Sequence, residues 1–227
     1  NRYDYRIFAE DAKDLDPADV FPAVCEDPKT DNWNAVPADR ITILPDGDMG
    51  SQLILAGIDT LDDSREADVM SVLGSSGNVY ASVDFLYVAA WKYEWDGKET
   101  TSPDYSTEIF RFKLQDARIS ESAKGLVPGS IVNQFSMDEY NGYFRIATTT
   151  GDAWMGSGNP SKNNLYILDG NLDIVGQVTG LAPGETIRSV RFMGDQAYIV
   201  TFRSVDPLFS IDLSDPRQPI VRGELKI

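Results

Sequence analysis

Aromatic and acidic residues gather in two polar stretches of the chain, residues 93–106 and 150–163, each placed between two apolar runs. Indole and phenol rings on loops offer a large contact area at low conformational cost, so they stack on sugars or fill pockets of a protein partner. The sequence therefore predicts a binding surface for a protein or a glycan, built from Trp91, Tyr93, Trp95, Asp96, Tyr105, Asp152, Trp154 and Met155. A purely structural role, in which these rings cover the end of the fold, is the alternative.

A second chemistry that the acids of these stretches permit is glycoside hydrolysis. It requires two carboxylates in a cleft, separated by about 5 Å or by about 6.5–9.5 Å according to the mechanism. Asp96, Asp104 and Asp152 are the acids that could form such a pair. The chain holds 36 Asp and Glu residues, so close acid pairs also arise by chance. A carboxylate-based hydrolase acting on glycans is therefore the alternative to a non-enzymatic module.

The absence of histidine removes several classes of site, since the chain has no His and one cysteine, Cys25. A Ser-His-Asp triad, a Cys-His pair and a His-ligated metal site cannot be built without an imidazole. One cysteine cannot form a disulfide within the chain. No phosphate loop, dinucleotide fingerprint or nucleophile elbow occurs either. We therefore assign no catalytic residue and expect no cofactor.

Acids also crowd the N-terminal segment of the chain. Calcium requires six to eight oxygen ligands from a loop, but no EF-hand spacing is present and Pro17 and Pro28 interrupt the run. We favour a solvated acidic segment and keep a calcium site as the alternative. The acids concerned are Asp11, Asp14, Asp16, Asp19, Glu26, Asp27 and Asp31.

The formal net charge of the chain is −16, which bears on its partners. A surface this acidic repels phosphate backbones and anionic membranes, so we expect no nucleic-acid partner. No apolar run approaches the roughly 20 residues of a membrane helix, so we also expect no membrane insertion. Such a charge fits a soluble extracellular or salt-adapted protein.

An internal repeat decides the fold class. GLVPGS begins at Gly125 and GLAPGE at Gly180, and similar apolar runs follow each copy. Each unit offers four short runs rich in Val, Ile, Tyr, Phe and Thr, separated by turn signals such as Asn141-Gly142. Four-stranded units at this period indicate an all-β, partial β-propeller of about three and a half antiparallel blades. A β-sandwich with accidental similarity between segments is the alternative.

The repeat also divides the chain. We expect blades at about 39–74, 78–127, 130–182 and 186–227 within a propeller fragment of residues 39–227. Residues 1–38 form an irregular acidic arm or the remnant of an earlier blade. Within a blade the long second connections, which hold the aromatic residues, share one end of the fold. Arg145 alternates with apolar residues on its strand and is expected in the core beside an acid.

Two long strings carry a family resemblance: NQFSMDEYNGYFRIATTT at 133–150 and YIVTFRSVDPLFSIDLSDPRQPIVRGELKI at 198–227. They resemble a family of secreted or surface-anchored bacterial and archaeal proteins with a C-terminal β-propeller distantly related to WD40 repeats. The resemblance covers roughly residues 40–227. It implies a propeller fold and an extracellular or cell-surface location, and it carries over no catalytic residue.

The resemblance also bears on the ends of the sequence. Members of this family continue beyond the position of Ile227 and begin before Asn1, and no signal peptide is present, so we expect a piece of a larger propeller. A cut propeller leaves sheet faces and strand edges open, and such surfaces pair with other chains. We therefore expect two copies to associate through exposed blade edges, or one terminus to be partly disordered.

Overall fold

The computed structural model describes residues 22–25, 29–30, 33–44, 48–62, 64–74, 77–94, 104–152, 160–202 and 207–226, apart from the side chains of 48–50, 93–94 and 104. The chain divides into two compact units. Unit 1 holds Asn1–Ser76 with Leu114–Ser120, and unit 2 holds Gly77–Lys113 with Glu121–Ile227. The domain boundary expected at residue 38 stays a prediction.

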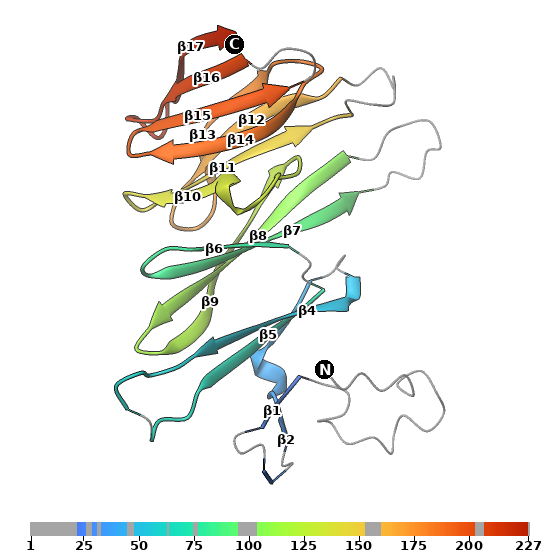
Figure 1. Cartoon of the computed structure of the whole chain (residues 1–227), viewed down its shortest axis with the longest axis vertical. Coiled ribbons are helices and arrows are strands. Elements are labelled where there is room, and N and C mark those ends of the chain that lie inside the picture. The colour runs from blue at the N-terminus through green and yellow to red at the C-terminus, as the bar shows by residue number, and fades with distance from the viewer. Residues whose placement is uncertain are drawn as a thin grey trace. The chain divides into compact units, whose positions relative to one another are not determined.

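Unit 2 contains three four-stranded sheets, each with its strands hydrogen-bonded in chain order (Figure 1). The first holds β6 (Asn78–Ala81), β7 (Phe85–Glu94), β8 (Asp104–Gln115) and β9 (Arg118–Pro128), although the tip of the β8–β9 hairpin counts with unit 1. The second holds β10 (Met137–Tyr140), β11 (Tyr143–Thr150), β12 (Lys162–Leu168) and β13 (Ile174–Leu181). The third holds β14 (Thr186–Met193), β15 (Gln196–Phe202), β16 (Pro207–Asp212) and β17 (Ile220–Lys226).

Two apolar layers between these sheets form the core of unit 2. Tyr87 and Ile109 of the first sheet pack with Phe144 and Ile146 of the second. Leu165 and Ile167 of the second sheet pack with residues of the third, among them Ile199 and Ile211. The middle sheet is therefore covered on both faces, which explains why β12 is buried at nearly every position rather than at every second one. The predicted all-β fold with four-stranded antiparallel sheets is confirmed.

The turn between β10 and β11 has the conformation that its Asn-Gly sequence predicts. Asn141 and Gly142 both have positive φ, 51° and 78°, and they connect Tyr140 to its partner Tyr143. Two consecutive positive φ values define the hairpin turn that matches the right-handed twist of paired strands, and Asn-Gly is its preferred sequence. The predicted turn is therefore present between β10 and β11.

The Pro-Gly repeat has one structural role in both copies. Gly129 and Gly184 have φ of 89° and 84°, a region that a residue with a Cβ enters at a cost. The amide of Gly129 donates to the carbonyl of Tyr105 at 2.7 Å, and that of Gly184 donates to the carbonyl of Ser161 at 2.8 Å. Each glycine thus ties the exit of the outermost strand to the start of the third strand of the same sheet.

Unit 1 contains less regular structure. A ribbon pairs β1 (Ala23–Cys25) with β2 (Trp33–Ala35), and half-buried Cys25 lies on β1. The short 3₁₀ turn η3 (Ala38–Arg40) leads into a three-stranded sheet of β3 (Ile41–Ile43), β5 (Asp68–Gly74) and β4 (Asp48–Gly57). β3 runs parallel to β5, whereas the sequence predicted antiparallel strands for this blade. Neither the ribbon nor the parallel pair was predicted, because both join segments that no tight turn connects.

No α-helix occurs among the described residues, and none of their helical segments has the length and hydrophobicity of a membrane span.

Candidate functional site

The second and third strands of each sheet in unit 2 are joined at one end of the unit, which we call the loop end. The connection from β7 to β8 covers 95–103, that from β11 to β12 covers 151–161, and that from β15 to β16 covers 203–206. Strands of an antiparallel meander alternate in direction, so these connections and the Pro-Gly exits share the loop end. The aromatic stretches predicted to bind a partner belong to the first two connections.

Trp91 and Tyr105 are the described aromatic residues of the predicted surface. Trp91 pairs with Thr107, and Tyr93 pairs with Tyr105, so Trp91 and Tyr105 point to the same face of the β7–β8 hairpin as diagonal neighbours. Their exposed fractions are 62% and 45%. Farther from the loop end the same face is buried, with Ala89 and Tyr87 inside the core. The exposed rings thus begin where the packed face ends.

Of the other residues of the predicted binding surface, the structure describes only Asp152 in full. Asp152 is half-buried and forms an isolated bridge with Pro160. The Tyr93 side chain and four whole residues, Trp95, Asp96, Trp154 and Met155, lie outside the described residues. The structure therefore brings Trp91 and Tyr105 together and leaves the rest of the predicted surface as a prediction.

Buried polar side chains fix the backbone beneath the loop end. The Thr107 hydroxyl donates to the carbonyl of Gly129 at 2.7 Å, and the Thr148 hydroxyl donates to the carbonyl of Pro128 at 2.7 Å. Thr107 lies on the first sheet and Thr148 on the second, so both sheets hold the same Pro-Gly exit. Buried hydrogen bonds of this kind rigidify the backbone next to Tyr105 and Thr107 at the loop end.

The second Pro-Gly exit is held in the same manner. The side-chain amide of Asn163 donates through Nδ2 to the carbonyls of Leu181 and Glu185, at 3.1 and 3.2 Å. The Thr201 hydroxyl, on the third sheet, donates to the Glu185 carboxylate at 2.5 Å. Sequence reasoning did not find these polar residues. The only signal was indirect: the Pro-Gly exits repeat, so whatever holds them should repeat as well.

The carboxylate pair that a hydrolase would need cannot be assembled from the described residues of the loop end. Of Asp96, Asp104 and Asp152, the structure describes only the Asp152 side chain, so the hydrolase remains a prediction. Within the described part of the chain no group of three or more Cys, Asp or Glu side chains could hold a metal ion. The N-terminal acids proposed for calcium lie outside it, so that site is also a prediction.

Two tyrosines whose pKa is raised, Tyr80 and Tyr87, lie together at the opposite end of unit 2. The Tyr87 hydroxyl donates to the Glu139 carboxylate at 2.9 Å, and the Ser82 hydroxyl donates to the same oxygen at 2.7 Å. Burial raises the pKa of Tyr87 well above 10, and the bond to Glu139 raises it further. Burial also raises the pKa of Tyr80, whose hydroxyl accepts from the Glu139 amide. The Tyr87 hydroxyl thus links the first sheet to Glu139 on β10 of the second.

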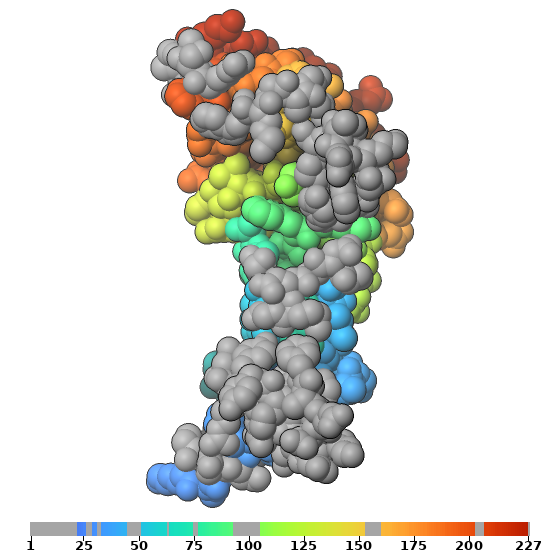
Figure 2. Space-filling model, turned by 90° about the vertical axis from the view of Figure 1, so that its right-hand side faces the viewer, coloured from blue at the N-terminus to red at the C-terminus, as the bar shows by residue number. Residues whose placement is uncertain are grey.

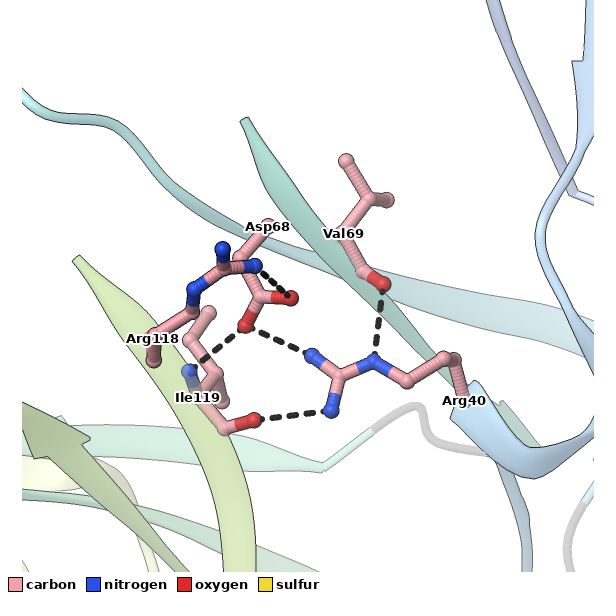
Figure 3. Close-up of polar contacts among 5 residues, drawn as sticks. All are labelled: Arg40, Asp68, Val69, Arg118 and Ile119. Atoms are coloured by element: carbon pink, nitrogen blue, oxygen red, sulfur yellow. Dashed lines mark hydrogen bonds and ion pairs between the residues drawn. The ribbon is translucent and has the colours of Figure 1, made fainter. Parts of the chain in front are cut away.

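The densest charged cluster of unit 1 is likewise structural (Figure 3). Asp68 on β5 accepts from the Arg40 guanidinium at 2.6 Å and from the Ile119 amide at 2.7 Å, and Arg118 lies 3.6 Å from its other oxygen. Arg40 also donates to the carbonyls of Ile119 at 3.0 Å and Val69 at 3.4 Å. The Asp68 carboxylate and the Arg40 guanidinium are thus paired with each other and with backbone groups, and they hold β5 and the Ile119 backbone together within unit 1.

Comparison with known proteins gives the family and two relatives. An uncharacterized protein of Methanocaldococcus jannaschii is 56% identical over 107 residues, covering 47% of this chain and 17% of its own length. An uncharacterized protein of Archaeoglobus fulgidus is 46% identical over 121 residues, covering 53% of this chain and 18% of its own length. The chain thus spans less than a fifth of either relative. A family model described as a beta propeller domain matches residues 1–227, and with the stacked four-stranded sheets this establishes that the chain belongs to the beta propeller domain family.

Proposed function

We propose that this chain is a non-enzymatic interaction module that binds a protein or a glycan at the loop end of unit 2. The observation that supports the proposal is that Trp91 and Tyr105 lie as exposed diagonal neighbours on one face of the β7–β8 hairpin, beside the buried hydrogen bond of Thr107 to Gly129. Rigid aromatic rings of this kind dominate binding energy because they lose little conformational freedom on contact. A binding module needs no catalytic residue, and this fits a chain without histidine.

The proposed location is extracellular or at the cell surface. It is supported by the resemblance of residues 133–150 and 198–227 to secreted and surface-anchored propeller proteins. A net charge of −16 favours solubility in that setting and disfavours anionic partners. Glycans and cell-envelope proteins without a strong negative charge are therefore the proposed ligand classes.

The test is a binding screen of the purified chain against a glycan array and a panel of cell-envelope proteins. For the strongest ligand found, Trp91→Ala should weaken binding about thirtyfold, which corresponds to about 2 kcal/mol for the loss of a central aromatic contact. Tyr105→Ala should weaken it in the same direction. The matched control is Met193→Ala, because Met193 is exposed at the end of β14 opposite to the loop end.

Two outcomes would overturn the proposal. One is a ligand whose affinity is unchanged by both aromatic substitutions. The other is a ligand whose affinity falls with Met193→Ala and not with Trp91→Ala, because it would place the binding surface at the opposite end of the sheets.

A further inference from the structure

Unit 2 contains two interfaces between neighbouring sheets, and both reach the end of the unit opposite to the loop end, which we call the turn end. The loop end faces the viewer in Figure 2, and the short turns of unit 2 lie to the left in Figure 1. The first interface joins the first and second sheets, and the second interface joins the second and third. Because both walls of each interface are sheets of this chain, the two can be compared position by position.

Strand register gives the equivalent positions of the two interfaces. Phe85 and Tyr143 each begin the second strand of their sheet, directly after a two-residue turn. Arg111 on β8 and Ile167 on β12 each pair with the residue two positions further along that second strand. Residues two apart on a strand share a face, and so do paired residues. Phe85 and Arg111 of the first interface therefore correspond to Tyr143 and Ile167 of the second.

A guanidinium occupies this level of the first interface. The central carbon of the Arg111 guanidinium lies 4.4 Å from the centroid of the Phe85 ring. Its Nη2 donates to the carbonyl of Gly170, in the turn between β12 and β13, at 2.7 Å. An arginine of one sheet thus lies against an aromatic ring and bonds to a turn of the next sheet, as the planar, delocalised guanidinium favours.

The second interface keeps the aromatic ring and lacks this guanidinium. Tyr143 has the position of Phe85, but Ile167 stands in the position of Arg111. Among the residues that line a cavity of about 40 Å³ here are Tyr143 and Ile167 of the second sheet, with Asp195 and Ser214 from turns of the third. A short apolar side chain in place of a long cationic one explains the space.

The volume of this cavity limits what it can hold. Its size of about 40 Å³ exceeds the roughly 10–15 Å³ that one water molecule needs, so the cavity is large enough for more than a single water. It is far below the roughly 300 Å³ of a pocket that encloses a whole small molecule. The head of one side chain, such as a compact planar guanidinium, suits this volume, whereas a sugar ring or a nucleotide does not.

The charges around the cavity favour a cation. Arg145, which also lines it, is neutralised by its ion pair with Asp138. Asp195 is exposed on the turn between β14 and β15, and its carboxylate has no hydrogen bond or ion pair within the described part of the chain. A cation that enters from solvent therefore meets an unpaired carboxylate beside the Tyr143 ring, and both attract it.

We propose that this cavity binds the guanidinium of an arginine side chain presented by a protein partner. The guanidinium lies against the Tyr143 ring, as that of Arg111 lies against Phe85, and donates to the Asp195 carboxylate. The net charge of −16 favours the approach of a basic segment. This site lies at the turn end and takes a ligand of its own, so it does not depend on binding at the loop end.

An NMR titration of the isotope-labelled chain with the capped tripeptide Gly-Arg-Gly tests the proposal. The backbone amide signals of Tyr143, Asp195 and Ser214 should shift and reach saturation. The same peptide with citrulline in place of arginine keeps the shape of the head group without its charge, so it should bind at least about tenfold more weakly. The lysine peptide carries the charge without the planar head, and it should also bind more weakly.

Asp195→Asn is the decisive variant, because Asp195 lies on an exposed turn and the substitution leaves the core unchanged. It should weaken binding of the arginine peptide at least about tenfold, or about 1.4 kcal/mol. The matched control is Asp84→Asn, which removes the same charge from the second residue of the equivalent turn between β6 and β7. A second variant, Ile167→Arg, supplies the guanidinium from within the chain and should abolish binding, with thermal unfolding as the check that it folds.

Several results would overturn the proposal. One is the absence of any shift at the three amides up to the solubility limit of the peptide. Another is an equal loss of affinity in Asp195→Asn and Asp84→Asn, because attraction to the acidic surface as a whole would then explain binding. Equal affinity for the arginine peptide and either analogue, or undiminished binding by a folded Ile167→Arg chain, would also contradict it. Trp91→Ala should leave binding of the arginine peptide unchanged, which keeps failure of this site distinct from failure at the loop end.

Discussion

Arg145 forms a buried ion pair with Asp138, which lies directly opposite it on the neighbouring strand β10. The guanidinium nitrogen Nε donates to the Asp138 carboxylate at 2.9 Å, and Nη1 donates to the carbonyl of Gly194 at 2.6 Å. The same guanidinium lies over the rings of Tyr140 and Phe192. Phe192 lies on β14 and Gly194 in the turn between β14 and β15, so one arginine with an exposed fraction of 3% joins the second sheet to the third.

Removal of the Asp138 charge should destabilise unit 2. Asp138→Asn leaves the Arg145 charge buried without its counter-ion, and that state is costly in a medium of low polarity. We expect the free energy of unfolding to fall by about 2 kcal/mol, less than for a fully buried pair because Asp138 retains some contact with water. Denaturation by urea measures the change.

The control for this prediction is Asp212→Asn. Asp212 also pairs with an arginine, Arg222, but that arginine is exposed and loses little when it returns to water. The effect of Asp138→Asn should therefore be clearly larger. Equal effects of the two substitutions would show that the position of Arg145 between the sheets adds nothing to stability.

Gly176→Ala should destabilise unit 2 although it adds one methyl group. The new Cβ meets the carbonyl of Pro216, which is backbone and cannot rotate away. We expect a loss of about 1–3 kcal/mol, the usual cost of overpacking. Gly170→Ala is the control, because no described atom lies within 4 Å of its Cβ, and it should leave the midpoint of thermal unfolding nearly unchanged. Two variants of equal stability would show that the Pro216 backbone places no constraint on residue 176.

Tyr87→Phe should cost about 2 kcal/mol at neutral pH, because it removes a hydrogen bond to the charged Glu139 carboxylate and leaves the ring stacked on Phe144. It should also change the response to alkali. Folding raises the pKa of Tyr87 above its ordinary value of 10.0, so the folded chain holds this proton more firmly than the unfolded chain. The associated stability is complete below pH 10 and is lost as the pH rises above it.

The alkaline effect can be checked by urea denaturation at a series of pH values. Wild-type stability should decline more steeply above pH 10 than that of Tyr87→Phe, so the difference between the two proteins should shrink as the pH rises. A difference that stays constant up to the highest pH would mean that Tyr87 ionises as readily in the folded chain as in the unfolded one.

Asp68→Ala should loosen the segment Leu114–Ser120 within unit 1. The Ile119 amide loses its acceptor, and Arg40 loses the carboxylate that orients it. Hydrogen exchange at the Ile119 amide should become at least about tenfold faster, as expected when local opening becomes easier by about 1.4 kcal/mol. Asp59→Ala, which removes a carboxylate bonded to Arg65 in the β4–β5 turn, should leave Ile119 unaffected. Unchanged exchange in both variants would contradict the role of Asp68.

Local signals in the sequence predicted much of this architecture. Asn141-Gly142 is a hairpin signal that acts over two residues, and it is confirmed. Arg145 was expected in the core beside an acid because it interrupts an apolar strand, and Asp138 confirms that expectation. The Pro-Gly repeat predicted equivalent sheets, since one backbone geometry with a glycine at positive φ recurs in both copies. In each case the determining residues are adjacent or share one hairpin.

Features that depend on distant residues could not be predicted in this way. Arg40 bonds to Asp68 and to Ile119, which are 28 and 79 residues away. The parallel pairing of β3 with β5 likewise joins residues far apart in the sequence, such as Ile41 and Ser71. Gly176 is required by a turn that lies on another sheet, so its sequence neighbours give no sign of the constraint. The candidate surface falls between these cases: strand register explains why Trp91 and Tyr105 share a face, whereas their ligand stays a prediction.

The most direct measurement of the central claim is a hydrogen-exchange footprint of the wild-type chain with the strongest ligand from the binding screen. We expect slower exchange at the loop end, at the amides around Trp91 and Tyr105 where β7 and β8 meet their connection. Protection confined to the opposite end, around Val83 and Met193, would contradict it.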